Sequence, residues 1–185
     1  SIDNPKFISA VEVGDGLADE DAGIAVSRGD THRFYPYNIL VRHEIVNDVI
    51  EGKEELVTYC PLCFSGVVYD PLVQGERVGF GTSGKLWNSN LIMYDRKTES
   101  YWSQVLGEAI VGEMAGTKLA ILPSDVTRFG EWRKEHPNGE VLSRETGVAG
   151  YDPDDYDRDP YGSYYTDAGV LFPVTSTDNR LGEKD

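Results

Sequence analysis

The two cysteines of the chain, Cys60 and Cys63, are the residues whose type and spacing most directly suggest chemistry. Only Pro61 and Leu62 separate them, so the two thiols lie close enough to form a disulfide, a redox couple or one edge of a metal site. A thioredoxin-like motif would place the pair at the start of a helix in a βαβ unit. Here β-rich sequence stands on both sides, so the disulfide, reactive-thiol and metal alternatives stay open.

A metal site would most readily hold a soft ion. Structural zinc is disfavoured because it needs a second cysteine pair or two closely spaced histidines, and the chain has three histidines far apart. Two thiolates and one imidazole can hold copper, with a thioether as fourth ligand. His43 is the candidate imidazole, since it stands at the start of the strand before the cysteine strand, and Met93 is the candidate thioether. The sequence therefore predicts copper, or less readily zinc, at Cys60, Cys63, His43 and Met93. A reactive thiol with His43 or Glu44 as base is a further alternative.

A second polar region runs from residue 79 to residue 104. Its glycine-rich part fails the phosphate-loop pattern, because Leu86 follows Lys85 and no long helix comes after, and it is predicted to be a turn-rich connection. A Ser83 nucleophile would need a histidine and an acid nearby. A carboxylate pair at Asp95 and Glu99 would suggest glycoside hydrolysis, although structural acids are commoner. The candidate pocket residues are Glu44, Ser83, Trp87, Asn90, Asp95, Arg96, Glu99, Trp102 and Gln104.

The elements that position these residues are predicted to be short antiparallel strands. Residues 22–28 and 31–35 are typical of a hairpin around Gly29-Asp30, a dipeptide that readily takes positive φ. A second hairpin is expected for residues 43–50 and 55–60, and a strand for residues 65–70 follows the cysteines. Further strands are predicted at residues 77–80, 91–94, 109–111 and 119–122. The pattern predicts a mainly β fold, sandwich or barrel-like.

One amphipathic helix is predicted near residues 124–136. Ser124 is the expected N-cap, and Val126, Phe129 and Trp132 recur every three residues to form the packing face. The Asp-, Tyr- and Pro-rich residues 147–185 show no periodicity, and we expect an extended segment that packs on the rest through its aromatic side chains. At 185 residues the chain is expected to be a single domain.

The composition is strongly acidic, with a net charge of −15 and a pI near 4.5. This charge argues against nucleic-acid binding, because a phosphate backbone would be repelled. It suits a hydrated surface at high salt, so a halophilic source and an ordinary acidic protein are both compatible with it. No stretch approaches the ~20 apolar residues of a membrane helix, and no targeting segment is visible at the start. We therefore expect a piece of a longer protein from which such a segment is absent.

Several motifs together resemble one family. They are residues 59–63 (YCPLC), 80–84 (FGTSG), 88–91 (NSNL), 93–96 (MYDR), 98–100 (TES) and 102–104 (WSQ), with residues 43–48, 159–161 and 172–174 extending the match over nearly the whole chain. The chain resembles the domain of unknown function 3179 family. This resemblance implies an exported or lipid-anchored prokaryotic protein, located outside the cell or at its envelope, and implies no defined activity.

Three functional hypotheses follow. The first is soft-metal binding, with copper at the cysteine loop. The second is a structural or surface-interaction module with a Cys60–Cys63 disulfide, whose Asp-rich tail meets a protein partner or a second copy. The third is an enzyme that acts on an unidentified small molecule through residues 81–104.

Overall fold

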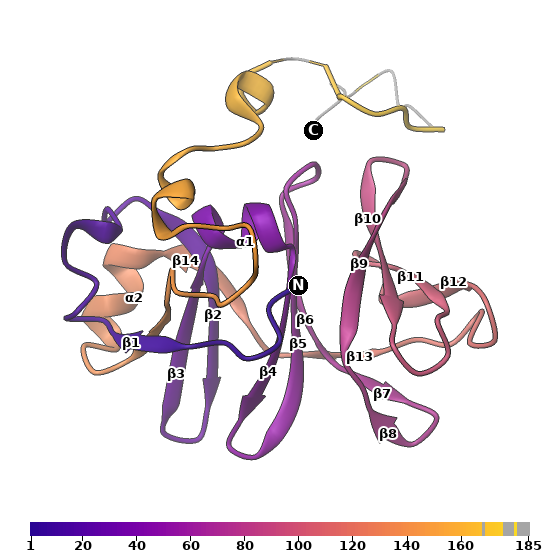
Figure 1. Ribbon diagram of the computed structural model, residues 1–185, viewed down its shortest axis with the longest axis horizontal. Coiled ribbons are helices and arrows are strands. Elements are labelled where there is room, and N and C mark those ends of the chain that lie inside the picture. The colour runs from indigo at the N-terminus through magenta and orange to yellow at the C-terminus, as the bar shows by residue number, and fades with distance from the viewer. Residues whose placement is uncertain (168, 176–179, 181–185) are drawn as a thin grey trace.

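The computed structural model describes residues 1–167, 169–175 and 180, and it consists mainly of β-sheets stacked side by side (Figure 1). The first sheet has five strands, in the order β1 (Phe7–Ser9), β15 (Glu140–Leu142), β3 (Thr31–Pro36), β2 (Ala22–Arg28) and β14 (Asp125–Arg128). The pairing of β15 with β3 is parallel, and the other pairings in this sheet are antiparallel.

Two antiparallel four-stranded sheets follow. The central sheet has the order β13 (Ala120–Leu122), β6 (Ser65–Asp70), β5 (Lys53–Cys60) and β4 (Ile45–Ile50). The third sheet has the order β12 (Glu108–Val111), β11 (Tyr101–Ser103), β10 (Asn90–Asp95) and β9 (Phe80–Trp87). A short ribbon of β7 (Leu72–Val73) and β8 (Glu76–Arg77) connects the two. The predicted mainly β class is thus confirmed.

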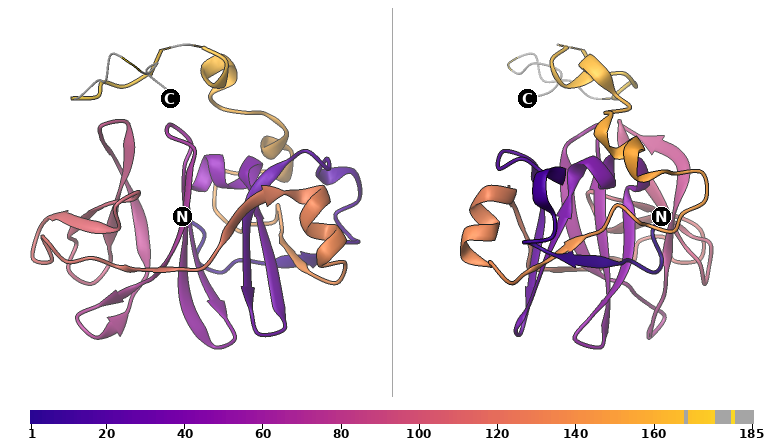
Figure 2. Two further views of the ribbon diagram at one scale, coloured as in Figure 1. Left: turned by 180° about the vertical axis from the view of Figure 1, so that it is seen from behind. Right: turned by 60° about the vertical axis from the view of Figure 1, so that its left-hand side comes forward.

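Helical segments cover the outside and one end of this stack. The α-helices are α1 (Tyr37–His43) and α2 (Phe129–Glu135), and the 3-10 helices are η1 (Gly14–Gly16), η2 (Pro153–Asp157) and η3 (Gly162–Tyr165). Figure 2 shows the segment with η2 and η3 running over the end of the molecule where α1 lies. Of the predicted 147–185 segment, residues 168, 176–179 and 181–185 lie outside the described part.

Three apolar clusters separate the layers. One packs α1 and the first sheet against one face of the central sheet, and it includes Ile24, Leu40 and Tyr59. A second, including Cys60 and Met93, fills the space between the other face of the central sheet and the third sheet. A third lies between α2 and the outer face of the first sheet. The central sheet is therefore covered on both faces, and its side chains alternate between two different cores.

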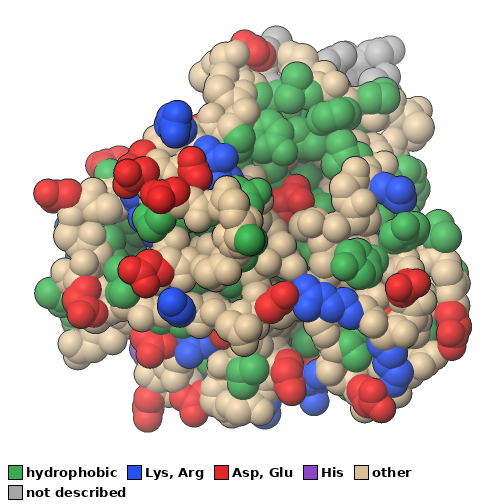
Figure 3. Space-filling model, viewed as in Figure 1, with side chains coloured by type: hydrophobic (Ala, Val, Ile, Leu, Met, Phe, Trp, Pro, Cys, Tyr) green, Lys and Arg blue, Asp and Glu red, His purple; other side chains and the backbone are tan. Residues whose placement is uncertain are grey.

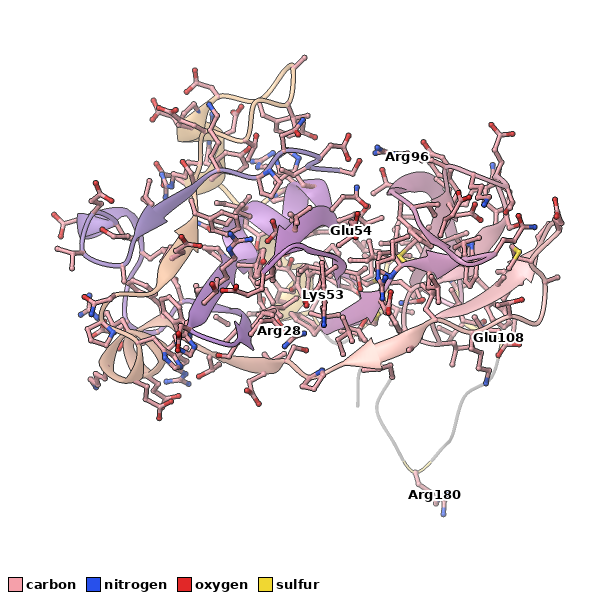
Figure 4. All side chains as sticks on the ribbon, turned by 90° about the horizontal axis from the view of Figure 1, so that it is seen from below. Arg28, Lys53, Glu54, Arg96, Glu108 and Arg180 are labelled. Atoms are coloured by element: carbon pink, nitrogen blue, oxygen red, sulfur yellow. The ribbon has the colours of Figure 1, made fainter. Side chains whose placement is uncertain are left out.

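Buried ion pairs also join the first and central sheets. Arg28 on β2 donates from two nitrogens to the carboxylate of Glu55 on β5, at 2.6 and 2.9 Å, and Glu55 is only 3% exposed. Arg33 on β3 pairs at 2.7 Å with Asp48 on β4, which also accepts a hydrogen bond from Tyr35. Figure 4 shows Arg28 beside the end of the β4–β5 hairpin that carries Lys53 and Glu54. These pairs fix how the two sheets lie against each other.

One prediction about local structure was wrong, and the predicted helix is present but starts later than expected. Residues 79–90 are not mainly a turn-rich connection, because residues 80–87 form β9 and pair with β10. The predicted helix at 124–136 begins only at Phe129, since residues 125–128 form β14 and pair with β2. Ser124 is therefore not the N-cap, and Val126 is 58% exposed on a strand instead of packing beside Phe129.

Candidate functional site

The cysteines lie at the tip of the β5–β6 hairpin. Cys60 is the last residue of β5, pairs with Ser65 at the start of β6 and is fully buried. Cys63 lies in the turn between the strands and is exposed, and both thiols are free. The next residue, Phe64, has φ of 52°, an uncommon conformation for a bulky side chain. The turn thus presents one thiol to solvent and keeps the other inside.

Polar side chains from two sheets surround the Cys63 sulfur. The amide of Asn90 on β10 donates to Sγ at 3.2 Å, and the hydroxyl of Ser65 lies 3.1 Å from Sγ. Both groups also reach Oε1 of Gln104, at 3.0 Å from Asn90 Nδ2 and 2.8 Å from Ser65 Oγ. The exposed sulfur is therefore held in a hydrogen-bonding cradle.

This cradle favours the thiolate form of Cys63. Its pKa is lowered from 9.0 to about 6, and the largest cause is a hydrogen bond with Cys60. Burial acts in the opposite direction, and hydrogen bonds from Ser65 and Asn90 add to the lowering. The pKa of Cys60 is raised by the same hydrogen bond, by burial and by the nearby Cys63 charge. The pair therefore divides into an outer thiolate and an inner thiol.

Gln104 anchors the cradle. Its side chain is fully buried, and its Nε2 donates to Thr58 Oγ1 at 2.9 Å and to the Ser65 carbonyl at 3.2 Å. It follows the end of β11, and its own backbone N–H donates to the Leu91 carbonyl. One amide side chain thus connects the central sheet to the third sheet through the two residues that contact Cys63.

Exposed apolar side chains neighbour the residues that form the cradle. Phe64 follows Cys63, Trp87 lies at the tip of the β9–β10 hairpin that carries Asn90, and Val105 follows Gln104; they are 49%, 45% and 45% exposed. Figure 3 shows hydrophobic side chains gathered at the upper part of the molecule, where the η3 segment lies over the ends of the two hairpins. We call Phe64, Trp87 and Val105 the apolar rim.

The structure does not bring His43 to the cysteines. Its Nε2 lies 2.6 Å from the hydroxyl of Tyr156, and its ring contacts that of Tyr151 at 4.5 Å between centroids. Burial lowers its pKa to about 4, and the N-terminal ammonium and Arg42 act in the same direction. Within the described part of the chain, no group of three or more His, Cys, Asp and Glu side chains is arranged to hold a metal ion.

The other two candidates near the cysteine strand have different settings. Met93 is fully buried and belongs to the same apolar cluster as Cys60. Glu44 ends α1 at φ of 59°, and its backbone carbonyl accepts from Tyr59 N–H. Burial raises the pKa of the Glu44 carboxyl to about 7, while the N-terminal ammonium acts against this. Only Met93 thus lies in the core that contains a cysteine.

The acids of the β10–β11 turn have a structural setting. Asp95 is fully buried and accepts from the backbone N–H groups of Lys97 and Thr98 and from Trp102 Nε1, at 3.1, 2.6 and 2.9 Å. Burial alone would raise the pKa of Asp95, but these hydrogen bonds lower it. Glu99 is exposed on the same turn. Asp95 is thus occupied with shaping the turn, which leaves it poorly placed to share a substrate with Glu99.

The remaining candidates lie apart from the thiols. Ser83 donates to the carbonyl of Ile92 across the β9–β10 hairpin, at the position where the register shifts. Arg96 pairs with Asp3 at 2.8 Å, and Figure 4 shows its side chain at the periphery of the molecule. Of the sequence candidates, the structure brings together Cys60, Cys63, Asn90 and Gln104, with Trp87 at the border.

Sequence reasoning missed Ser65 and Thr58. Both are small hydroxyl residues of β6 and β5 whose role depends on Gln104, a residue 39 positions from Ser65 in the chain. One local signal existed for Ser65, since a serine two residues after the second cysteine lies opposite the first cysteine once the strands pair. Thr58 gave no such signal.

Comparisons with known proteins identify a family and nothing further. A search of curated proteins and a search of solved structures each found no match. Within the described residues, no helix is both long and apolar enough to cross a membrane. The family described as "Protein of unknown function (DUF3179)" matches residues 1–185, and the chain therefore belongs to this family.

Proposed function

We propose that Cys60 and Cys63 form a redox dithiol that exchanges disulfides with a partner molecule. The observation that carries the proposal is the exposed Cys63 sulfur, surrounded by groups that favour its thiolate and adjacent to a second, buried thiol. Thiol–disulfide exchange begins with attack by a thiolate. A purely structural disulfide gains nothing from such a cradle around its outer sulfur.

The two cysteines have different roles in this proposal. The Cys63 thiolate attacks one sulfur of the substrate disulfide, that disulfide breaks, and the departing thiolate takes a proton from water. Cys60 then loses its proton and attacks Cys63 Sγ in the mixed disulfide, which releases the second substrate thiolate. The substrate gains two electrons, and the dithiol becomes the Cys60–Cys63 disulfide. The reverse sequence oxidises a dithiol substrate.

The environment of Cys60 fits its second role. The largest cause of its raised pKa is the hydrogen bond with Cys63, and the Cys63 charge raises it further. Once Cys63 is joined to substrate, its sulfur no longer carries that charge. Cys60 therefore becomes easier to deprotonate at the step where its thiolate is needed.

The apolar rim favours a peptide or protein disulfide as substrate, because an apolar segment beside that disulfide would cover Phe64, Trp87 and Val105. An exported location would suit the proposal, since disulfides persist in oxidising compartments. The proposal therefore includes a protein partner and a position outside the cytoplasm.

Equilibration with glutathione tests the proposal. The protein is equilibrated at a series of ratios of reduced to oxidised glutathione, quenched with acid and analysed by mass spectrometry. It should convert from the dithiol to the internal disulfide in one two-electron step. Cys60→Ser should instead accumulate a mixed disulfide with glutathione at Cys63, whereas Cys63→Ser should form little at buried Cys60. A wild type that forms no internal disulfide, or a Cys60→Ser variant that forms no adduct, would refute it.

Soft-metal binding is a second candidate, supported by two neighbouring thiols and by a methionine in the same apolar cluster as Cys60. Met93 is the member of that cluster that carries a thioether, and the thiols of Cys60 and Cys63 lie near enough to shift each other's pKa. Thiolate and thioether ligands select Cu(I), and two thiolates suit it better than zinc, which needs four ligands. In this arrangement His43 is not a ligand.

A Cu(I) titration against a competing chelator separates the two candidates. Metal binding predicts one equivalent bound to the reduced protein, loss of uptake in Cys60→Ser and in Cys63→Ser, weaker uptake in Met93→Leu and no change in His43→Ala. A reduced protein that leaves Cu(I) with the chelator while still forming its internal disulfide would eliminate the metal and retain the redox proposal.

A further inference from the structure

An open pocket of about 750 Å³ lies on the other side of the β5–β6 hairpin from the thiols. Its walls are formed by the η1 loop, by α1 and by the segment from η2 to η3. Its volume is within the range of small-molecule sites, ~300–1,000 Å³. Tyr59 lines it, whereas the next residue, Cys60, points into the opposite core, so the pocket and the dithiol are separate sites.

Ion pairs and hydrogen bonds hold the C-terminal wall of the pocket in place. Arg144 pairs with Asp157 at 2.6 Å, and Arg42 donates to the carbonyl of Arg158 at 2.6 Å. Tyr156 is buried and hydrogen-bonded to His43. The wall is thus attached to α1 and to the segment that follows β15 at several points.

Aromatic rings line the interior of the pocket. The rings of Tyr37 and Tyr59 are stacked, with centroids 4.0 Å apart, and the rings of Phe64 and Tyr165 meet at 4.8 Å. The face of an aromatic ring attracts ammonium and guanidinium groups, while the body of the ring packs against apolar groups. The walls therefore suit a ligand that combines a cation with an apolar body.

The charges of the pocket also favour a cation. Its lining contains four aspartates, at positions 15, 21, 157 and 159, and two arginines, at positions 144 and 158. Arg144 is occupied by Asp157, and Arg158 lies 3.7 Å from Asp155. The other three lining aspartates make no ion pair with any residue in the part of the chain that the structure describes. Figure 3 shows acidic side chains, with basic ones among them, on the side of the molecule where the η1 loop lies.

Two buried polar atoms in the lining have no hydrogen-bond partner within the described structure. They are the hydroxyl oxygen of Tyr37 and Oδ1 of Asn38. Buried polar atoms are nearly always paired, and an amide oxygen can only accept. Neither atom is exposed to solvent, so a ligand in the pocket does not reach them, and the aspartates, which an anion would face, decide the charge that the pocket accepts.

We propose that this pocket binds an organic cation in which a guanidinium or primary amine is attached to an apolar body. The cation lies against the aromatic rings, and Asp15 and Asp159 supply the compensating charge. The same chemistry is presented by a free small molecule and by an arginine or lysine side chain of a peptide.

An isosteric probe series tests the charge requirement. Isothermal titration calorimetry should detect binding of benzamidine, at least about tenfold weaker binding of neutral benzamide, and no binding of benzoate. Added salt should weaken the binding of benzamidine, because the aspartates are open to solvent and salt screens their charge. Arginine amide and an arginine-containing tripeptide form the second arm, and tighter binding of the tripeptide would assign the cation to a peptide side chain. Benzamide binding as tightly as benzamidine, or no binding of any probe, would overturn the proposal.

Matched variants locate the binding. The double variant Asp15→Asn with Asp159→Asn should bind benzamidine about tenfold more weakly. The side-chain amide oxygen introduced at position 159 can still accept the hydrogen bond that Asp159 receives from Tyr161 N–H. Asp30→Asn, in the distant β2–β3 turn, should leave the affinity unchanged, as should Cys63→Ser, and thermal unfolding confirms that each variant is folded. Unchanged affinity in the double variant would place the probe elsewhere and overturn the assignment.

Discussion

Removing the Cys60 thiol should raise the pKa of Cys63. The hydrogen bond with Cys60 is the largest cause that lowers this pKa to about 6 from 9.0, so Cys60→Ala removes the main stabilisation of the thiolate. Asn90→Ala removes a smaller contribution and should raise the pKa less. Both variants leave Cys63 itself and its exposed position unchanged.

The size of the effect determines the assay. At pH 7 a thiol of pKa 6 is ~90% thiolate and one of pKa 9 is ~1% thiolate, a ratio of ~90. The intrinsic nucleophilicity of a thiolate falls with its pKa at a Brønsted slope of ~0.4–0.5, so the rate constant of the thiolate of pKa 6 is lower by a factor of ~20 than that of the thiolate of pKa 9. The net advantage at pH 7 is therefore only ~4-fold, so a single rate constant would be a poor test.

The pH dependence of alkylation separates the two effects. Iodoacetamide labelling of Cys63, followed by peptide mass spectrometry from pH 4.5 to 9.5, should show a midpoint near 6 in the wild type. The midpoint should move upwards in Asn90→Ala and further in Cys60→Ala. A wild-type midpoint near the ordinary thiol value, or a Cys60→Ala midpoint that stays near 6, would refute the proposed role of the hydrogen bond.

Three further predictions concern buried or half-buried polar residues near the cysteine strand and in the β10–β11 turn. Gln104→Ala should lower the free energy of unfolding by ~2–3 kcal/mol in urea titrations, because it leaves buried groups unpaired, whereas exposed Gln74→Ala should change it by less than ~0.5 kcal/mol. The pKa of Glu44 is raised to about 7, so between pH 4.5 and pH 7 the folded state binds a proton that the unfolded state does not. The stability that this proton contributes is lost as the pH rises through 7. Glu44→Gln should therefore match the wild type in stability at pH 5 and be more stable than the wild type at pH 8. The pKa of Asp95 is lowered in the folded state, so its ionised carboxylate stabilises the fold above pH 3.8, and this stabilisation is lost as the pH falls through the folded-state pKa. Asp95→Asn should therefore be less stable than the wild type at pH 7, whereas Glu99→Gln, at an exposed position, should not. Equal stability of the two turn variants at pH 7 would contradict the structural role of Asp95.

The hairpins could be predicted because their turns are encoded locally. Gly29-Asp30 and Glu51-Gly52 each connect strands whose registers follow directly from the turn. The prediction for residues 79–90 fails because glycine is ordinarily a turn signal. Gly81 instead lies within a strand, and a side chain is excluded there because an added Cβ would lie 2.6 Å from the ring of Tyr94 on the neighbouring strand. Nothing local in the sequence distinguishes a glycine that turns the chain from one that admits a neighbour.

The cysteine pair could be found from its spacing, but its partners could not. Asn90 and Gln104 reach Cys63 only because the third sheet packs against the central sheet, a contact between segments far apart in sequence. His43 was placed near the thiols by the predicted hairpin, and that hairpin is real. The strand begins only at Ile45, however, and His43 is the last residue of α1, where it packs against Tyr156, 113 residues away.

The alternation of side chains along β5 explains how one hairpin serves two sites. Tyr59 and Cys60 are adjacent, yet a strand directs them to opposite faces, so Tyr59 lines the cation pocket and Cys60 supports the outer thiol. Phe64 is the residue that belongs to both surroundings, since it lines the pocket and follows Cys63 directly. A ligand in the pocket can therefore influence the thiol by moving Phe64 or by moving η3, whose Tyr164 hydroxyl donates to the carbonyl of Leu62 between the two cysteines. The cradle of Ser65, Asn90 and Gln104 lies on the other side of the hairpin from the pocket, and its hydrogen bonds act on Cys63 directly.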